Sequence, residues 1–161
     1  MPKLIFVGGP PGVGKSAAAR RVFERVPGSA WLDGDDVWRM NPFAPDDARR
    51  RMVERNISFV LRGFLEQGFE TVILSWVLHR MDLVDRLVES LDGLEFELRF
   101  FVLLCSEDRL RSCIAGDPGR TTPVDRAAER LRQCAALPDA ERIDTDALSA
   151  DGVAERIVSA L

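Results

Sequence analysis

One short segment near the amino terminus combines glycines, a lysine and a serine at a spacing that suits phosphate binding. Gly9 and Gly14 occupy the two glycine positions of the pattern G-x-x-x-x-G-K-[S/T], and Gly12 lies between them. Lys15 and Ser16 complete the pattern. Glycines let the backbone turn tightly, so that successive amide hydrogens point at phosphate oxygens. The lysine can then reach the outer phosphates and the hydroxyl can bind Mg2+, which predicts a site for ATP and magnesium.

The sequence on either side of this loop fits the same chemistry. Residues 3–7 form a short apolar run that is typical of a strand buried on both faces, and from residue 15 to about 26 apolar residues recur at helical spacing. A helix that begins at the lysine adds the positive end of its dipole to the phosphate site. We therefore expect the whole loop, including Val13 and Ala17, to contact the nucleotide.

Acidic residues gather after the next predicted strand, residues 29–33. Asp33, Asp35 and Asp36 lie within four residues of one another, at the carboxyl end of the strand, where ligands bind in open parallel sheets. Their mutual repulsion is tolerable if a metal or a substrate hydroxyl lies among them. One acid could hold Mg2+ and another could accept the proton of an attacking hydroxyl. The alternative is a solvated turn with a helix N-cap at Asp35 or Asp36.

Strand and helix patterns alternate along the rest of the chain. The predicted strands are residues 3–7, 29–33, 70–77, 96–105 and 142–145, and the predicted helices are 15–26, 46–67, 81–91, 107–115, 124–136 and 152–161. Repeated alternation predicts a parallel, doubly wound sheet with right-handed crossovers. The length of 161 residues suits one domain, residues 1–161.

The sequence resembles the small P-loop kinases, which include gluconate kinase, shikimate kinase, adenylylsulfate kinase and the chloramphenicol phosphotransferases. The resemblance rests on GPPGVGKS after the first strand, LDGDD after the second, the arginine-bearing segment 109–120 and the closing RIDTDALSADGVAERIVSAL. It implies a three-layer α/β P-loop NTPase fold with a five-stranded parallel sheet in the order 2-3-1-4-5. It also implies that Asp35 is the base or acceptor ligand, and that Asp33 either lies on the magnesium side or supports the groups that bind the metal.

One position departs from this resemblance. Many relatives have an aspartate or another polar signature at the end of the third strand, where this chain has Ser75 and Trp76. The usual acidic partner of magnesium is then either absent or supplied by Asp33.

A glycine- and proline-containing segment, residues 116–123, is predicted to be a mobile lid between helices. Arg120 would close over the phosphates and stabilise charge in the transition state, or it is an exposed loop arginine. Arg109 and Arg111 divide between a solvated helix face and a nucleotide contact, and the resemblance favours Arg111 for adenine. It also places the loop at Asp146 against adenine, mainly through backbone groups.

The acceptor pocket is expected beyond the acidic segment and along the helix that follows it. Trp38, Arg39, Arg55 and Asn56 are the candidate substrate residues, although a tryptophan in this position can also serve packing alone. The arginines at 49–51 suit a solvated helix face, unless the acceptor is an anion.

Composition excludes several other classes of protein. A net charge of -4 provides no overall basic field for nucleic acid, and no apolar run approaches the roughly 18 residues of a membrane span. Cys105, Cys113 and Cys134 are an odd number without CxxC spacing, which fits reduced thiols in a cytoplasmic protein. The lone His79 suits a structural or surface residue better than a base.

Together these features predict an ATP-dependent phosphotransferase that moves the terminal phosphoryl group to a hydroxyl of a small molecule. Lys15, Asp35 and Arg120 are the predicted catalytic residues, and ATP and Mg2+ are the expected cofactors. The alternative is a nucleotide-binding regulatory ATPase without a small-molecule acceptor. The identity of the acceptor is left open, as is the choice between a monomer and a homodimer.

Overall fold

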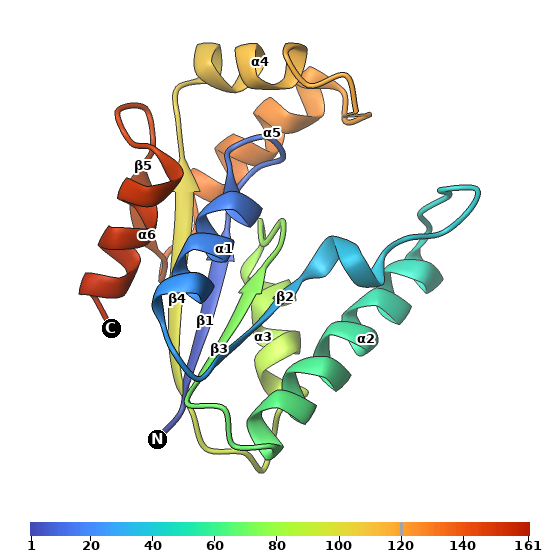
Figure 1. The fold of residues 1–161 in the computed structure, drawn as a ribbon. Coiled ribbons are helices and arrows are strands. Elements are labelled where there is room, and N and C mark those ends of the chain that lie inside the picture. Colours follow the sequence, from blue (N-terminus) through green and yellow to red (C-terminus); the bar gives the residue numbers. More distant parts are fainter. Residues whose placement is uncertain (120) are drawn as a thin grey trace.

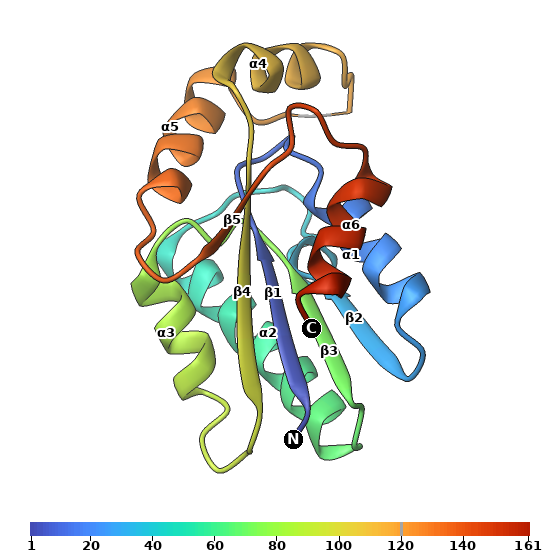
Figure 2. The ribbon, with the colours of Figure 1, turned by 90° about the vertical axis from the view of Figure 1, so that its left-hand side faces the viewer.

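A five-stranded parallel sheet forms the centre of the molecule, in the order β2-β3-β1-β4-β5 (Figures 1 and 2). The computed structural model describes residues 1–119 and 121–161. The strands are β1 (Lys3–Gly8), β2 (Ser29–Asp33), β3 (Thr71–Ser75), β4 (Glu97–Leu104) and β5 (Glu141–Asp144). The helices are α1 (Lys15–Arg25), α2 (Asp47–Glu66), α3 (Met81–Glu89), α4 (Glu107–Ala115), α5 (Val124–Ala135) and α6 (Ala150–Ser159), with a short 3-10 helix η1 (Gly34–Val37). The predicted fold class and strand order are confirmed.

Helices cover both faces of the sheet and make three layers. Successive residues of β1 point to opposite faces, so Leu4 and Phe6 pack with α2 and α3, whereas Ile5 and Val7 pack with α1 and α6. All four side chains are fully buried, as expected for a central strand. Figure 2 shows α1 and α6 side by side on one face, and α4 lies across the end of the sheet.

Short polar side chains cap the amino-terminal ends of several helices. Asp46 accepts a hydrogen bond from the Arg49 backbone N–H at 2.8 Å and so caps α2, while Ser149 caps α6 in the same way. At the other end of α2, Gly68 has φ +88°, the left-handed conformation expected of a glycine that ends a helix.

The register of the sheet brings the two chemically promising segments to one edge. Ser75 at the end of β3 pairs with Val7 of β1 on one side and with Asp33 of β2 on the other. The glycine-rich loop leaves β1 and the acidic segment leaves β2 at this same carboxyl edge, below α4 in Figure 1. Within the described ranges, no helix is long and apolar enough to cross a membrane.

Candidate active site

The loop between β1 and α1 has a backbone that only glycine allows at its turning points. Gly9, Gly12 and Gly14 have φ values of +146°, +90° and +100°. A Cβ atom on Gly9 would lie 2.8 Å from the Leu103 carbonyl oxygen and 2.9 Å from a Val13 methyl group. The shape of the loop is therefore fixed both by its dihedral angles and by the strand packed behind it.

The start of α1 suits an anion. Gly14 is its N-cap residue, the described residues provide no side-chain cap, and the first turn holds no acidic residue. A helix that begins in this way leaves backbone N–H groups to be satisfied by a ligand. The Lys15 ammonium group donates to the Pro10 carbonyl oxygen at 2.9 Å, so its charge lies over the loop. Loop, helix end and lysine together fit the phosphates of a nucleotide.

A cavity of about 230 Å³ adjoins this loop and extends under α4. Gly12 packs closely below that helix, because a Cβ atom there would lie 3.1 Å from the Ile114 side chain. The cavity is lined by Gly12, Val13, Gly14, Ala17, Leu103, Cys105, Arg109, Cys113, Thr145, Leu148, Ser149, Ala150 and Val153. Its place beside the phosphate loop suits the base and ribose of the same nucleotide.

The three polar candidates near this cavity have different surroundings. Arg111 binds Glu107 at 2.6 Å and is not among the lining residues that the structure describes. Arg109 lines the cavity and donates to the Asp146 carbonyl oxygen. The Asp146 carboxylate accepts from the Ser106 backbone N–H at 2.9 Å, which ties the loop before α6 to the start of α4. Arg109 is therefore better placed than Arg111 to face this cavity, and the adenine contact expected of Arg111 stays a prediction.

Two cysteines also line the cavity, a feature that the sequence did not indicate. Cys113 is exposed, whereas burial and the nearby Asp146 carboxylate raise the pKa of Cys105 to about 11. Cys113 is therefore the more accessible thiol beside the nucleotide site.

The acidic segment is folded as η1, and Asp33 rather than Asp35 or Asp36 is its N-cap. One Asp33 carboxylate oxygen accepts from the Asp35 backbone N–H at 3.0 Å. Asp36 forms an ion pair with Arg39 at 2.6 Å and raises the pKa of the Arg39 guanidinium. The charges of Asp33 and Asp35 raise this pKa further. All three carboxylates thus act on the Arg39 guanidinium. Gly34 is required here because a Cβ atom would lie 2.5 Å from the Trp76 ring.

The end of β3 carries the hydroxyl of Ser75, at the position where many of the kinases that the sequence resembles have an acidic residue. The Ser75 hydroxyl accepts from the Trp31 indole N–H at 3.0 Å and so joins β2 to β3. The described residues include no group of three metal-binding side chains. Mg2+ usually binds through one or two carboxylates together with substrate phosphates, so a larger cluster is not required. Magnesium binding by Ser16 and Asp33 stays a prediction.

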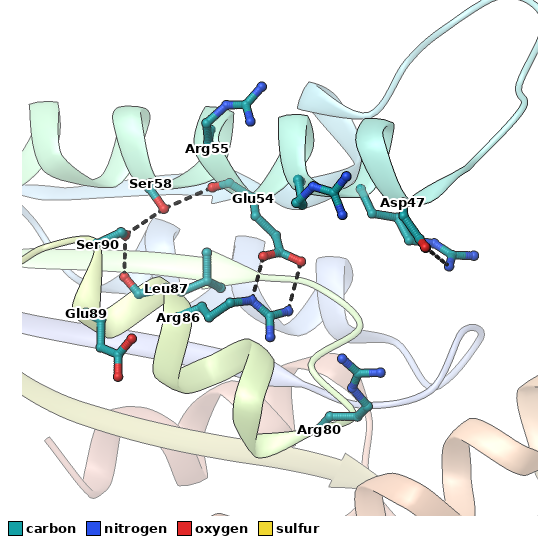
Figure 3. Close-up of a pocket in the computed structure, with 11 residues that line it drawn as sticks. Asp47, Glu54, Arg55, Ser58, Arg80, Arg86, Leu87, Glu89 and Ser90 are labelled. Atoms are coloured by element: carbon teal, nitrogen blue, oxygen red, sulfur yellow. Dashed lines mark hydrogen bonds and ion pairs between the residues drawn. The ribbon is translucent and has the colours of Figure 1, made fainter.

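The predicted acceptor residues lie in two places, the loop after η1 (Trp38 and Arg39) and helix α2 (Arg55 and Asn56). Trp38 packs edge-on against Phe43, with ring centroids 5.5 Å apart, which supports a packing role. Arg39 is 81% exposed. Arg55 lines an open cleft of about 870 Å³ between α2 and α3, whereas Asn56 is exposed and lies outside the cleft as the structure describes it (Figure 3).

Arg120, the predicted lid arginine, lies outside the described residues. In the part of the lid before it, the Asp117 carboxylate accepts from the Gly119 backbone N–H at 3.1 Å. The role of Arg120 therefore stays a prediction.

His79 follows β3 near the same edge and is half-buried. A ring nitrogen lies 3.0 Å from the Val77 carbonyl oxygen. Burial lowers the pKa of His79, and the charges of Arg130 and Arg80 lower it further. Arg130 was not among the predicted site residues, and the only sequence signal for it is the four-residue spacing from Arg126 on α5.

No family model and no curated protein matches the sequence. Solved structures do match the fold. The Deinococcus radiodurans tunicamycin resistance protein superposes with a TM-score of 0.77 at 22% identity, over 99% of this chain and 95% of that one. A gluconokinase from Sinorhizobium meliloti superposes with a TM-score of 0.72 at 22% identity, over 98% of this chain and 90% of that one. A sugar kinase from Janibacter sp. superposes with a TM-score of 0.75 at 19% identity, over 99% of this chain and 94% of that one.

Proposed function

We propose that this chain, which has the fold of the P-loop kinases, is an ATP-dependent phosphotransferase acting on a hydroxyl of a small molecule. One observation carries the proposal. The phosphate-binding loop after β1 and the acidic segment after β2 open on the same edge of the sheet, with only the end of β3 between them. A phosphoryl donor and a group that accepts a proton are both needed at one place for transfer.

The nucleotide is held mainly by backbone. The amides at the start of α1 and the Lys15 ammonium group bind the phosphates, and the cavity under α4 takes the base and ribose beside Arg109. Ser16 and Asp33 would hold Mg2+, which would supply positive charge at the outer phosphates.

The acceptor reacts through its hydroxyl oxygen. Asp35 orients this hydroxyl and takes its proton, while the oxygen forms a bond to the terminal phosphorus of ATP. The bond from that phosphorus to the bridging oxygen breaks, and ADP leaves. Lys15 neutralises the charge that develops on the transferred group, and Arg120 completes the site when the lid closes.

Trp38, Arg39, Arg55 and Asn56 are the proposed substrate residues. Arg55 is the best supported of the four, because it lines the α2–α3 cleft, which has room for a small molecule.

The test is acceptor-dependent ADP release with magnesium-ATP, over a panel of sugar acids, nucleosides, nucleotides, shikimate and antibiotics. We expect one compound class to stimulate release. Asp35→Asn should keep nucleotide binding and lose about 10²- to 10⁴-fold in turnover, because the proton acceptor is removed. Asp36→Asn is the matched control, with the same charge change one residue away and an expected loss below about tenfold.

Two results would count against the proposal. A fully active Asp35→Asn protein would remove the base from the mechanism. Tight ATP binding without stimulation by any compound would favour a nucleotide-binding regulatory ATPase instead.

A further inference from the structure

The start of α4 differs from the usual beginning of a helix that a serine caps. Ser106 is the N-cap residue, and its hydroxyl accepts from the Arg109 backbone N–H at 3.4 Å. In the common capping box, the residue in the position of Arg109 is Glu or Gln, whose side chain bonds back to the N–H of the cap residue. A guanidinium group only donates hydrogen bonds, so Arg109 cannot do this. The backbone N–H of Ser106 therefore needs an acceptor from elsewhere in the chain.

Asp146 supplies that acceptor from a position 40 residues away in the sequence. One oxygen of its carboxylate, Oδ1, accepts from the Ser106 backbone N–H at 2.9 Å and from the Ser106 hydroxyl at 3.3 Å. The backbone carbonyl oxygen of Asp146 accepts from the Arg109 guanidinium group. A single residue thus holds both the cap residue of α4 and the arginine in its first turn.

The loop that carries Asp146 is itself fixed to the sheet. Thr145 is 3% exposed, and its backbone N–H and its hydroxyl both donate to the Leu104 carbonyl oxygen, at 2.8 and 3.1 Å. Leu104 in turn pairs with Asp144 across β4 and β5. The Asp144 carboxylate accepts from the Asp146 backbone N–H at 2.9 Å. Asp146 is therefore a rigid support, and α4 is the element that it holds.

Helix α4 packs apart from the main core. Figure 2 shows it across the end of the sheet rather than on either face. Its buried side chains form a small cluster with α5, separate from the two clusters that cover the faces of the sheet, and the buried members are Leu110, Ile114, Ala127 and Leu131. This cluster holds the middle and the end of α4. The position of the first turn depends on the hydrogen bonds to Asp146.

These hydrogen bonds join two walls of the cavity beside the phosphate loop. Cys105 and Arg109 line it from the side of α4, and Thr145 and Ser149 line it from the side of the loop before α6. Asp146 is not among the lining residues that the structure describes. Its side chain therefore acts on the cavity through the residues that it holds.

The stability of α4 does not explain an arginine in its first turn. Positive charge at the start of a helix is unfavourable with respect to the helix dipole. A place on the cavity wall does explain Arg109, and Asp146 then provides the hydrogen bonds that a Glu or Gln in this position would have made.

We infer that Asp146 is a positioning residue for the nucleotide. Its carboxylate fixes the distance between the two walls through Ser106, and its carbonyl group orients Arg109 beside the base and ribose. The inference rests on the proposed function, which assigns this cavity to the nucleotide. Walls that are already in place increase affinity, because binding then does not have to order them.

Two ligands separate the cavity from the phosphate loop. The β,γ-imido analogue of ATP can occupy both, whereas inorganic tripolyphosphate has no base or ribose and can occupy only the loop. Isothermal titration calorimetry with Mg2+ measures the affinity of the whole protein for each. We expect Asp146→Ala to weaken binding of the ATP analogue about tenfold, as for the loss of one charge-assisted hydrogen bond. Binding of tripolyphosphate should be unchanged, because Lys15 and the glycines of the loop are intact.

Two variants control for the size and the charge of the side chain. Asp146→Asn keeps an oxygen that can accept from Ser106, so its affinity for the ATP analogue should stay within about threefold of the wild-type value. Asp108→Ala removes a carboxylate from the same turn of α4. The exposed Asp108 side chain forms no hydrogen bond or ion pair within the described part of the chain, so both affinities should be unchanged.

Ser106→Pro tests the same hydrogen bonds from the other side. Proline has no backbone N–H, and the Ser106 φ of -63° already suits it. We expect this variant to weaken binding of the ATP analogue about tenfold and to leave tripolyphosphate binding unchanged, as Asp146→Ala does.

Three results would overturn the inference. The first is an equal loss of both ligands in Asp146→Ala and Ser106→Pro, which would indicate general damage to the fold. The second is an unchanged affinity of these variants for the ATP analogue. The third is a loss in Asp146→Asn as large as in Asp146→Ala. A wild-type protein that binds neither ligand would instead contradict the proposed function.

Discussion

The nucleotide side and the acceptor side of this molecule are built in different ways. On the nucleotide side, backbone conformation makes the site: glycines with positive φ, an uncapped helix end and a buried strand hold it in shape. On the proposed acceptor side, partly exposed side chains of α2 and α3 line an open cleft. A backbone site depends on a few adjacent residues, whereas a side-chain site depends on residues that the fold brings together.

The two sides also differ in how strongly the fold depends on them. Residues Leu4 and Val7 of β1 have no exposed surface, so the strand that ends in the phosphate loop belongs to the core. On α2, Phe59 is 80% exposed, and Arg55 is also on the surface. Substitutions of such exposed residues should therefore cost little stability.

The largest expected effect concerns the single lysine of the nucleotide side. Lys15→Ala should reduce turnover by about 10³-fold or more, because it removes charge stabilisation of the transferred phosphoryl group. The chain has one other lysine, Lys3, at the far end of β1, so Lys3→Ala is the matched control. Steady-state kinetics with the stimulating acceptor measure the turnover of both variants. Equal loss in the two variants would mean that Lys15 acts only through stability.

The thiols distinguish the nucleotide cavity from the rest of the protein. At pH 8, the thiols of Cys105 and Cys134 are almost entirely protonated, because burial raises both pKa values to about 11. Cys113 is exposed and should be the thiol that reacts rapidly with a disulfide reagent. Since Cys113 lines the cavity, Mg2+ with the ATP analogue should slow this reaction.

Absorbance of the released thiol follows the rate. Cys113→Ser should remove the fast phase. A fast phase that the nucleotide leaves unchanged would place the base somewhere other than under α4.

A pair of glycine substitutions tests the difference in stability between the two sides. Gly9→Ala should lower the free energy of unfolding by about 1–3 kcal/mol, because φ is +146° and the new methyl group would meet the Leu103 carbonyl oxygen. Gly63→Ala should raise it by about 0.5–1 kcal/mol, because this residue lies in α2 with open space around it. Urea denaturation measures both, and a stabilising Gly9→Ala would contradict the rigid-loop description.

The same contrast explains which parts of the fold and the site could be predicted from the sequence. The phosphate loop was predicted because its chemistry is carried by eight consecutive residues, and the sheet followed from the strand and helix alternation. Arg109 and Arg111 show a limit: two residues along a helix correspond to a rotation of about 200°, so only the structure tells which of them faces the cavity.

The cleft between α2 and α3 shows a second limit. Arg50 and Arg80 both line it although they are far apart in sequence, and no local pattern indicates that α2 and the residue before α3 bring them together. Arg50 belonged to a run that reads as a solvated helix face, an interpretation that depended on the charge of an unknown acceptor. Sites made of exposed side chains leave little trace in periodicity, because periodicity reports burial.

The fate of the terminal phosphoryl group in water enriched in ¹⁸O tests the central claim most directly. The protein is incubated in this water with magnesium-ATP and the stimulating acceptor. The masses of the products are then measured by mass spectrometry. Transfer to a hydroxyl predicts a phosphorylated acceptor without ¹⁸O, formed in step with ADP. Inorganic phosphate carrying one ¹⁸O atom, with no phosphorylated acceptor, would show hydrolysis and contradict the account.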